Sequence, residues 1–337
     1  NDMEQNTDER KIEEILAPNG TKGFLNRFIF GIIYGLAVII PGISGAAISI
    51  IFKLYDNLLY SVSNLFKKFK ICFIYLLPIL LGFCIGFIVG FFAIQKLLEV
   101  LPFSLILLFA GLMIGSFPIV LKEIKGNKRN IKNTSLFLAG LLIPSLILIF
   151  TVILNFSTLQ NDAQGIIDNV DDATRYFGDF PFWMFLAAIP IGMVMGVTQV
   201  VPGLSASAFL MMIGWFSPIM DSIHFDYIKN NPKIILLLLI LVIGFVAGFF
   251  LTSKLIDFAI NKNRITTYQV IVGLSLGSIL TMFLNPDIFT IYLSWYYNGI
   301  VGTRGIVDIA LAAPLLIGGV ILAYVLVRFE MKKTAEN

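Results

Sequence analysis

A series of apolar runs, each long enough to cross a lipid bilayer, constrains this chain more than any other feature. Residues 135–154 contain no charged side chain, and a helix needs only about 20 apolar residues to span the hydrocarbon core. Charged residues make up 13% of the chain and the mean hydropathy is +0.89, whereas a soluble domain carries about 25% charged residues. The sequence therefore predicts an all-α polytopic membrane protein.

The cysteines and the charged residues exclude several classes of site. Cys72 and Cys84 fall on one expected helix, about three turns apart along its axis, which is too far for a disulfide. The chain has one histidine, and its charged residues form no metal-ligand pattern. We expect no metal, no cofactor and no nucleic-acid partner; the expected surroundings are the membrane bilayer.

An internal repeat organises the chain. Residues 31–45 read GIIYGLAVIIPGISG and residues 192–206 read GMVMGVTQVVPGLSA. Both copies contain two glycines four residues apart, followed by a Pro-Gly-x-Ser string. We interpret the paired glycines as positions of close helix packing.

Two further matches follow in the same order. Residues 85–99 and 243–257 are identical at eight of fifteen positions, and this alignment pairs Lys96 with Lys254. A Gly-Leu-x-x-Gly-Ser string then begins at Gly111 and again at Gly273. Chance similarity between apolar helices would not preserve this order, so the chain consists of two homologous halves.

Each half has the same expected plan, a stretch broken by Pro-Gly followed by three apolar spans. The first repeat covers residues 24–155 and the second covers residues 182–329. The expected elements are a hairpin at 24–64 with helices at 71–95, 102–121 and 134–155, and a hairpin at 182–220 with helices at 233–258, 266–284 and 306–329.

The distribution of basic residues favours Pro-Gly stretches that turn back rather than cross. If each stretch is a re-entrant hairpin and the N-terminus is inside, only five of the 24 Lys and Arg residues lie outside, whereas single crossings divide the basic residues evenly. The five are Lys96, Arg175, Lys229, Lys233 and Arg304. The hairpin arrangement puts segments 1–23 and 330–337 in the cytoplasm and loop 156–181 outside the cell membrane.

A hairpin plus three spans crosses the membrane an odd number of times. The second repeat is therefore expected to be inverted relative to the first. Inverted repeats with broken helices are typical of secondary transporters.

The Pro-Gly breaks are the candidate binding site. Pro41 lacks an amide hydrogen, Gly42 permits a turn, and Ser44 can cap a following helix. Free N–H groups at such a helix start attract anions, and two inverted breaks would meet near the membrane midplane. The expected site residues are Pro41, Gly42, Ser44, Gly45, Ala46, Gln199, Pro202, Gly203, Ser205 and Ser207. The alternative is that the breaks only kink spanning helices.

Charged residues near the ends of the spans are candidates for gates or for cations that collect a headgroup. They are Lys53, Asp56, Lys96, Glu99, Lys254, Asp257 and Arg304. The alternative is that they are interfacial ion pairs whose long side chains reach toward water.

Enzymatic readings find little support in the sequence. Residues 42–45 read Gly-Ile-Ser-Gly, a string also found in intramembrane serine proteases, but His224 lies in an expected loop and cannot serve as the base. The clustered arginines of a lipid phosphatase and the phosphate-binding string of an ATP-driven pump are both missing. We expect a transporter, and an ion-coupled secondary transporter of a small soluble anion remains an alternative.

The combination of motifs resembles a known bacterial family. The two Pro-Gly-x-Ser breaks, the glycine pairs before them and the Ile-Gly-Phe-x-x-Gly-Phe-Phe helix after them are similar to a membrane family once catalogued as a domain of unknown function. That family is associated with translocation of undecaprenyl phosphate, the lipid carrier of cell-wall precursors. The resemblance covers about residues 24–329. The second copy departs from the first at Ala206 and Ser207, where the first has Gly45 and Ala46.

The resemblance implies a substrate and a direction. A polyprenyl phosphate would place its compact, doubly charged headgroup between the two breaks while its tail stays in lipid. Alternating access would return the carrier from the outer leaflet to the inner leaflet for reuse in peptidoglycan synthesis.

Overall fold

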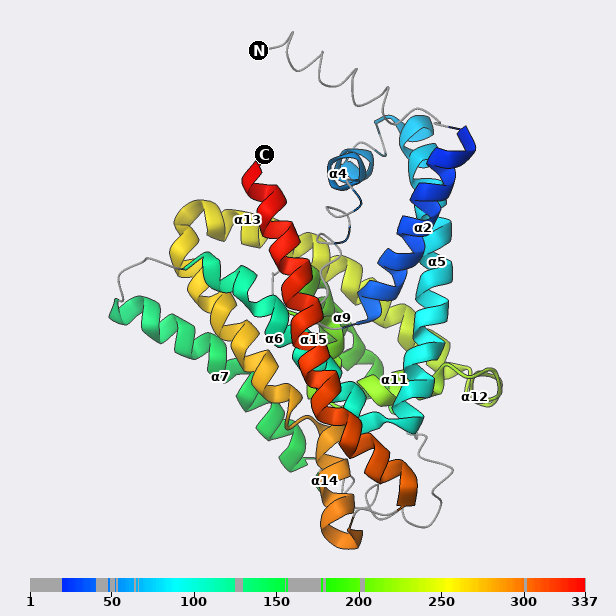
Figure 1. Cartoon of the computed structure of the whole chain (residues 1–337), viewed down its shortest axis with the longest axis vertical. Helices are drawn as coiled ribbons and strands as arrows, with labels where there is room; N and C mark the ends of the chain where they lie inside the picture. Colours follow the sequence, from blue (N-terminus) through cyan, green and yellow to red (C-terminus); the bar gives the residue numbers. More distant parts are fainter. Residues whose placement is uncertain are drawn as a thin grey trace. The chain divides into compact units, whose positions relative to one another are not determined.

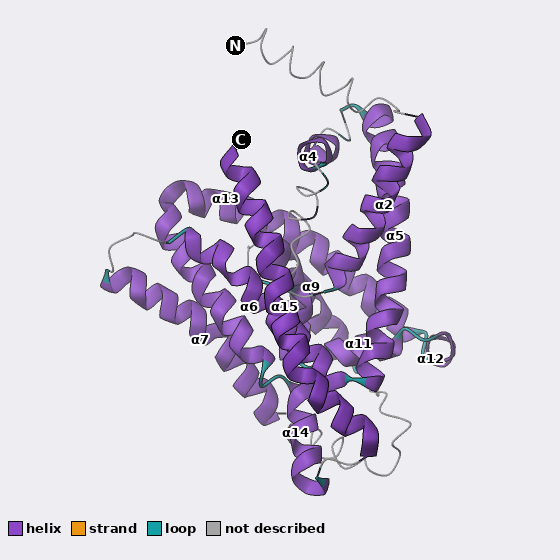
Figure 2. Cartoon of the chain, in the orientation of Figure 1, coloured by secondary structure: helices purple, strands orange, loops and turns teal. Residues whose placement is uncertain are grey.

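The structure is a computed structural model that describes residues 20–40, 48, 52, 54–63, 65, 67–124, 130–154, 156, 177, 180–200, 204–299 and 302–336. Most of these residues are helical and none of them forms a strand (Figure 2), so the expected all-α class is confirmed. Seven of the described segments are long and apolar enough to cross a membrane, and Phe182–Thr198 is a shorter apolar helix. The chain is a multi-pass membrane protein.

The chain forms two compact units, Asn1–Ile94 with Val325–Asn337, and Gln95–Tyr324. In the first unit, α2 (Gly20–Ile39) packs along α5 (Phe69–Val100), and α4 (Tyr55–Ser63) lies between them in sequence (Figure 1). The second unit contains α6 (Pro102–Lys122), α7 (Ile131–Leu154), α9 (Phe182–Val200), α10 (Ala206–Met212), α11 (Phe216–Ser222), α12 (Phe225–Asn230), α13 (Lys233–Met282), α14 (Pro286–Asn298) and most of α15 (Gly302–Glu336).

The label α13 covers two of the expected helices, those at 233–258 and 266–284. Between them Asn263 is not helical, with φ −162° and ψ 88°, so α13 consists of two helical segments that meet at this residue. The Asn263 side chain accepts a hydrogen bond from Thr266 N and begins the second segment.

Glycines bring the backbones of α2 and α5 into contact. A Cβ at Gly31 would overlap the carbonyl oxygen of Ile79, and a Cβ at Gly35 would overlap that of Phe83. Because only glycine permits this approach, these positions fix how the two helices cross.

The second repeat builds the same crossing from α9 and α13. A Cβ at Gly192 would overlap the carbonyl oxygen of Leu241, and a Cβ at Gly196 would overlap that of Phe245. The packing role expected for the glycine pairs is confirmed in both copies.

These contacts also correct the alignment of the helices that follow. Gly82 faces the Phe28 carbonyl in α2 as Gly244 faces the Ile189 carbonyl in α9, so Gly82 is equivalent to Gly244. The sequence alignment instead paired Gly244 with Gly86, one helical turn away. A Gly-Phe-x-x-Gly-Phe string occurs in two overlapping registers in the first repeat and in one register in the second, and the sequence match chose the wrong register. Lys96 and Lys254 are consequently not equivalent.

The later helices of the two repeats are exchanged within the second unit. A Cβ at Gly111 in α6 would overlap the carbonyl oxygen of Leu316 in α15, and a Cβ at Gly273 in α13 would overlap that of Phe137 in α7. In each repeat, the second of the three spans after the hairpin therefore packs against the last span of the other repeat: α6 against α15, and the second segment of α13 against α7.

The two equivalent helices, α6 and the second segment of α13, run in opposite directions. The last turn of α6 contacts the start of the second segment of α13, where Arg264 Nη2 lies 2.6 Å from Glu123 Oε2. The first turn of α6 contacts α14, which follows α13, with the ring centroids of Phe103 and Trp295 4.9 Å apart. An inverted repeat requires this arrangement of the pair. Inversion of the complete halves stays a prediction.

After each break the chain returns along the helix that precedes the break. In the first repeat, the Phe52 ring lies 5.5 Å from the ring of Phe30 in α2, and Ile48 is buried in the same cluster. In the second repeat, the Trp215 ring lies 5.4 Å from that of Phe177, which precedes α9. These contacts of the described residues agree with the expected hairpins, which stay a prediction.

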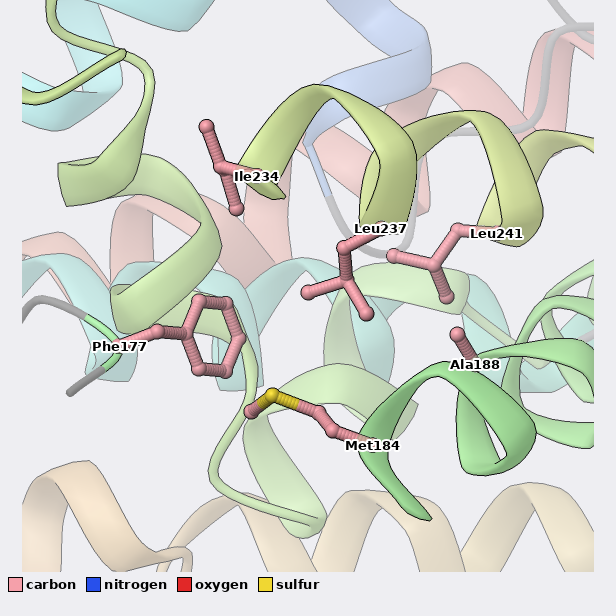
Figure 3. Packing of buried hydrophobic residues seen from close by; sticks show 6 residues of the cluster. All are labelled: Phe177, Met184, Ala188, Ile234, Leu237 and Leu241. Atoms are coloured by element: carbon pink, nitrogen blue, oxygen red, sulfur yellow. The ribbon is translucent and has the colours of Figure 1, made fainter. Parts of the chain in front are cut away.

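The core of the second hairpin is apolar. Figure 3 shows Met184 and Ala188 of α9 directed toward Ile234, Leu237 and Leu241 of α13. All five side chains are buried, and this cluster holds α9 against α13.

Candidate functional site

The described part of the candidate site is the start of α10. Ser205 is the N-cap residue, with φ −134° and ψ 132°, and its hydroxyl accepts a hydrogen bond from Ala208 N at 3.4 Å. Ser207 is the second residue of α10 and is buried. A serine in extended conformation can begin a helix in this way because its side chain satisfies one free N–H group.

A second hydroxyl beside this break is already used. Thr198 Oγ1, near the end of α9, donates to Met195 O at 2.7 Å. Intrahelical bonding of this kind satisfies the threonine locally, so Thr198 contributes little to ligand binding in this state.

Other expected site residues lie outside the described part of the chain. The residues not described are Pro41, Gly42, Ser44, Gly45, Ala46, Lys53, Pro202 and Gly203, and the side chains not described are those of Asp56, Gln199, Lys254, Asp257 and Arg304. Of the residues expected to bind the headgroup, the structure describes the side chains of Ser205 and Ser207 alone, at the start of α10.

A hydrogen bond ties α11, which follows α10, to the end of α5. Gln95 Nε2 donates to Met220 O at 2.7 Å, and the Gln95 side chain is buried. Because this bond is buried, it is a stronger constraint than an exposed polar contact. It fixes the returning arm of the second hairpin against the last turns of α5.

Lys96 and Glu99 form an ion pair at the end of α5. Lys96 Nζ lies 2.5 Å from Glu99 Oε2, and the lysine side chain is 74% exposed. This geometry matches the simple ion pair that was the alternative for these residues. Their role as a gate stays a prediction.

Asp308 has a role that the sequence did not reveal. Its carboxylate accepts hydrogen bonds from Phe103 N at 3.0 Å and Ser104 N at 2.7 Å, and Ser104 Oγ donates to the Asp308 carbonyl. Asp308 in α15 thus caps the start of α6, whose own N-cap position is Leu101. The missing local cap before Pro102 was the only signal of this contact.

The described residues contain no cluster of three or more His, Cys, Asp or Glu side chains that could hold a metal ion. The groups available at the described start of α10 are hydroxyl and backbone N–H groups, which can donate hydrogen bonds to an anion.

Comparison with known proteins adds independent information. A family model described as undecaprenyl phosphate translocase-like (VCA0040-like) matches residues 15–101 and 34–295. A protein of Staphylococcus aureus (strain NCTC 8325 / PS 47) named polyprenyl-phosphate transporter is 27% identical over 282 residues, which are 82% of this chain and 92% of that protein. No solved structure matches the chain.

Proposed function

Because the chain belongs to the undecaprenyl phosphate translocase-like family, we propose that it carries a polyprenyl monophosphate across the cytoplasmic membrane. The direction is from the outer leaflet to the inner leaflet, which returns the lipid carrier for reuse in cell-wall polymer synthesis. The name of the Staphylococcus aureus relative, polyprenyl-phosphate transporter, supports the substrate. The chain performs no covalent chemistry in this proposal.

The single observation that carries the mechanism is the repeated helix crossing. Gly31 meets α5 as Gly192 meets α13, and each crossing supports a stretch that turns back after a Pro-Gly break. The two repeats thus offer two equivalent hairpins. Many secondary transporters build a substrate site with access from either face of the membrane in this way.

The headgroup is held by the breaks themselves. Ser205 and Ser207 lie at the described start of α10, and Pro41, Gly42, Ser44, Gly45, Ala46, Gln199, Pro202 and Gly203 complete the proposed set. A phosphate monoester carries about −1.5 to −2 charges and three acceptor oxygens, so it can replace water as the partner of several hydroxyl and N–H groups. The isoprenoid tail remains in lipid, beside the exposed apolar faces of the helices.

Charged groups near the ends of the spans assist entry and release in this mechanism. Lys96 is mostly exposed beside Glu99 and can attract a headgroup at one face. Lys53, Asp56, Lys254, Asp257 and Arg304 are proposed for the same task. Both termini lie in the cytoplasm.

Substitution at the breaks tests the proposed site. We expect Ser44→Leu combined with Ser205→Leu to abolish movement of a labelled polyprenyl phosphate between the leaflets of liposomes, because bulky apolar side chains would displace the headgroup. Ser135→Leu is the matched control, since Ser135 is exposed at the start of α7. Full transport by a well-folded double variant would reject the site.

A further inference from the structure

The first repeat contains a buried arginine, Arg27, whose guanidinium is only partly hydrogen-bonded by the described residues. Arg27 lies in α2 and is 7% exposed. Its Nε donates to Gly23 O at 3.0 Å, while Nη1 is buried without a hydrogen-bond partner among the described residues. An unsatisfied guanidinium N–H in an apolar interior is costly, so the position calls for an explanation.

The guanidinium lies on a buried tyrosine of α5. Arg27 Cζ is 4.7 Å from the centroid of the Tyr75 ring, within the range of a cation–π interaction. Tyr75 is 2% exposed, and its hydroxyl faces the Asn57 side chain without a hydrogen bond of good geometry among the described residues. Arg27 Nη1 is thus a buried donor that the described residues leave unused, and it lies beside a second buried donor, the Tyr75 hydroxyl.

The second repeat shows that the fold does not need this pair. Arg27 lies one turn before Gly31, and Ala188 lies one turn before the equivalent Gly192. Both are on the helix face that meets the partner helix. Ala188 is 0% exposed, so the same buried position is filled by a methyl group.

The partner position follows the same pattern. Tyr75 lies one turn before Ile79, whose carbonyl meets Gly31, and Leu237 lies one turn before Leu241, whose carbonyl meets Gly192. Leu237 is 0% exposed and belongs to the apolar cluster of Figure 3. The Ala–Leu pair therefore supports the same crossing without a polar atom.

We propose that Arg27 and Tyr75 form an anion site for a phosphate monoester, present in the first repeat and absent from the second. The inference rests on the proposed function and names one place where the headgroup is held. A guanidinium offers a planar fork of N–H donors that matches phosphate oxygens, and the Tyr75 hydroxyl adds a third donor.

The site lies near the beginning of α2 and is closed in the described state. Leu58 and Tyr60 of α4 pack against the cluster that contains Tyr75, and Lys68 Nζ donates to the Tyr60 hydroxyl at 3.1 Å. A headgroup reaches Arg27 when α4 moves aside, and Lys68 supplies a second cation at the entrance.

The test exchanges the pair for the one that the second repeat uses. Arg27→Ala with Tyr75→Leu is compared with wild-type protein in nanodiscs by titration with farnesyl phosphate and, separately, with inorganic phosphate. Arg264→Ala is the control for the loss of one positive charge, because the Arg264 side chain is 63% exposed, where it pairs with Glu123 and lies over the Tyr268 ring. We expect farnesyl phosphate to bind about tenfold more weakly or worse to the double variant, with unchanged binding in the control.

The two ligands distinguish the source of the anion. Weaker binding of farnesyl phosphate alone identifies a lipid headgroup site, and weaker binding of both ligands identifies a general phosphate site. Affinities within twofold of wild type for both ligands would overturn the proposal.

Two further measurements keep the result interpretable. The melting temperature reports folding of the double variant. Should it fail to fold, Arg27→Lys replaces it: this variant keeps the charge but lacks the fork, and we expect about threefold weaker binding. Binding of farnesyl phosphate to the Arg27→Lys variant at wild-type affinity would contradict the site.

Leaflet-to-leaflet transport by wild-type protein separates this inference from the proposed function. Binding that depends on Arg27 in a protein that moves no lipid would reject the function and keep the site. Transport together with binding that ignores Arg27 would reject the site alone.

Discussion

The α2/α5 and α9/α13 crossings share their backbone contacts but differ in the side chains around them. Gly31 and Gly192 each let two helices touch through main-chain atoms. One turn away, the first crossing buries Arg27 and the second buries Ala188. The comparison teaches that the helix geometry comes from glycine spacing, whereas the polarity of the interior is free to diverge.

The exchanged helix pairs differ in a similar way at their ends. The start of α6 is capped by Asp308, which belongs to the other repeat. The equivalent start in α13 is capped locally, because Asn263 Oδ1 accepts from Thr266 N at 3.1 Å. The same helix is thus anchored through a tertiary contact in one copy and through its own turn in the other.

A large effect is expected where both crossings depend on glycine. A Cβ at Gly86 would overlap the Ile32 carbonyl, and a Cβ at Gly248 would overlap the Met193 carbonyl. Gly86→Leu and Gly248→Leu should each cost about 3 kcal/mol or more, the upper range for overpacking, and should reduce the yield of monodisperse protein. A Cβ at Gly318 meets nothing within 4 Å, so Gly318→Leu is the control. A large loss of stability from only one of the two substitutions would contradict the equivalence of the α2/α5 and α9/α13 crossings.

The second repeat should reject the polar pair of the first. Ala188→Arg with Leu237→Tyr buries a charge in a cluster whose members are all apolar. We expect a loss of about 3–5 kcal/mol from an uncompensated buried charge, measured as a fall in thermal stability. Ala188→Leu is the control for added volume without charge. If the Ala188→Arg/Leu237→Tyr variant were as stable as wild type, the α9/α13 crossing would not have the apolar core that we describe.

The caps should differ in strength. Asp308→Ala removes the acceptor of two backbone N–H groups, one of which belongs to the buried Ser104, and should cost about 1–3 kcal/mol. Asn263→Ala removes one exposed cap and should cost about 0.5–1 kcal/mol. Thermal melting of both variants measures the difference, with Asp226→Ala in exposed α12 as the control. Equal losses would show that the tertiary cap adds nothing.

The smallest effect is expected at the ion pair of α5. A double-mutant cycle with Lys96→Ala and Glu99→Ala should give a coupling of about 0.2–1 kcal/mol, because the lysine is largely exposed. Transport by the Lys96→Ala variant provides a separate readout of the proposed gate. A coupling well above this range would indicate a pair that is held more rigidly than an exposed one.

The sequence predicted the spans well because their signal is local. Runs of apolar residues mark where α6, α7 and α15 lie, and the repeated Gly-x-x-x-Gly strings marked the crossing faces of α2 and α9. The same local similarity misled the alignment of α5 with α13, because a periodic Gly-Phe string matches itself one turn away.

The polar contacts could not be read from the sequence. Asp308 caps residues that lie more than 200 positions earlier in the chain, so no local sequence pattern indicates this contact. Nothing in the sequence distinguishes Arg27 from other basic residues near a helix start. Its burial and its contact with Tyr75 follow from the packing of α2 against α5, and the equivalent Ala188 shows that the helix crossing does not require an arginine.

The most direct test of the account is movement of a labelled polyprenyl phosphate between the leaflets of liposomes that contain only the purified protein. We predict protein-dependent movement that unlabelled polyprenyl phosphate competes and inorganic phosphate does not. Absence of movement, with or without an ion gradient, would contradict lipid transport and would favour an ion-coupled transporter of a small soluble anion.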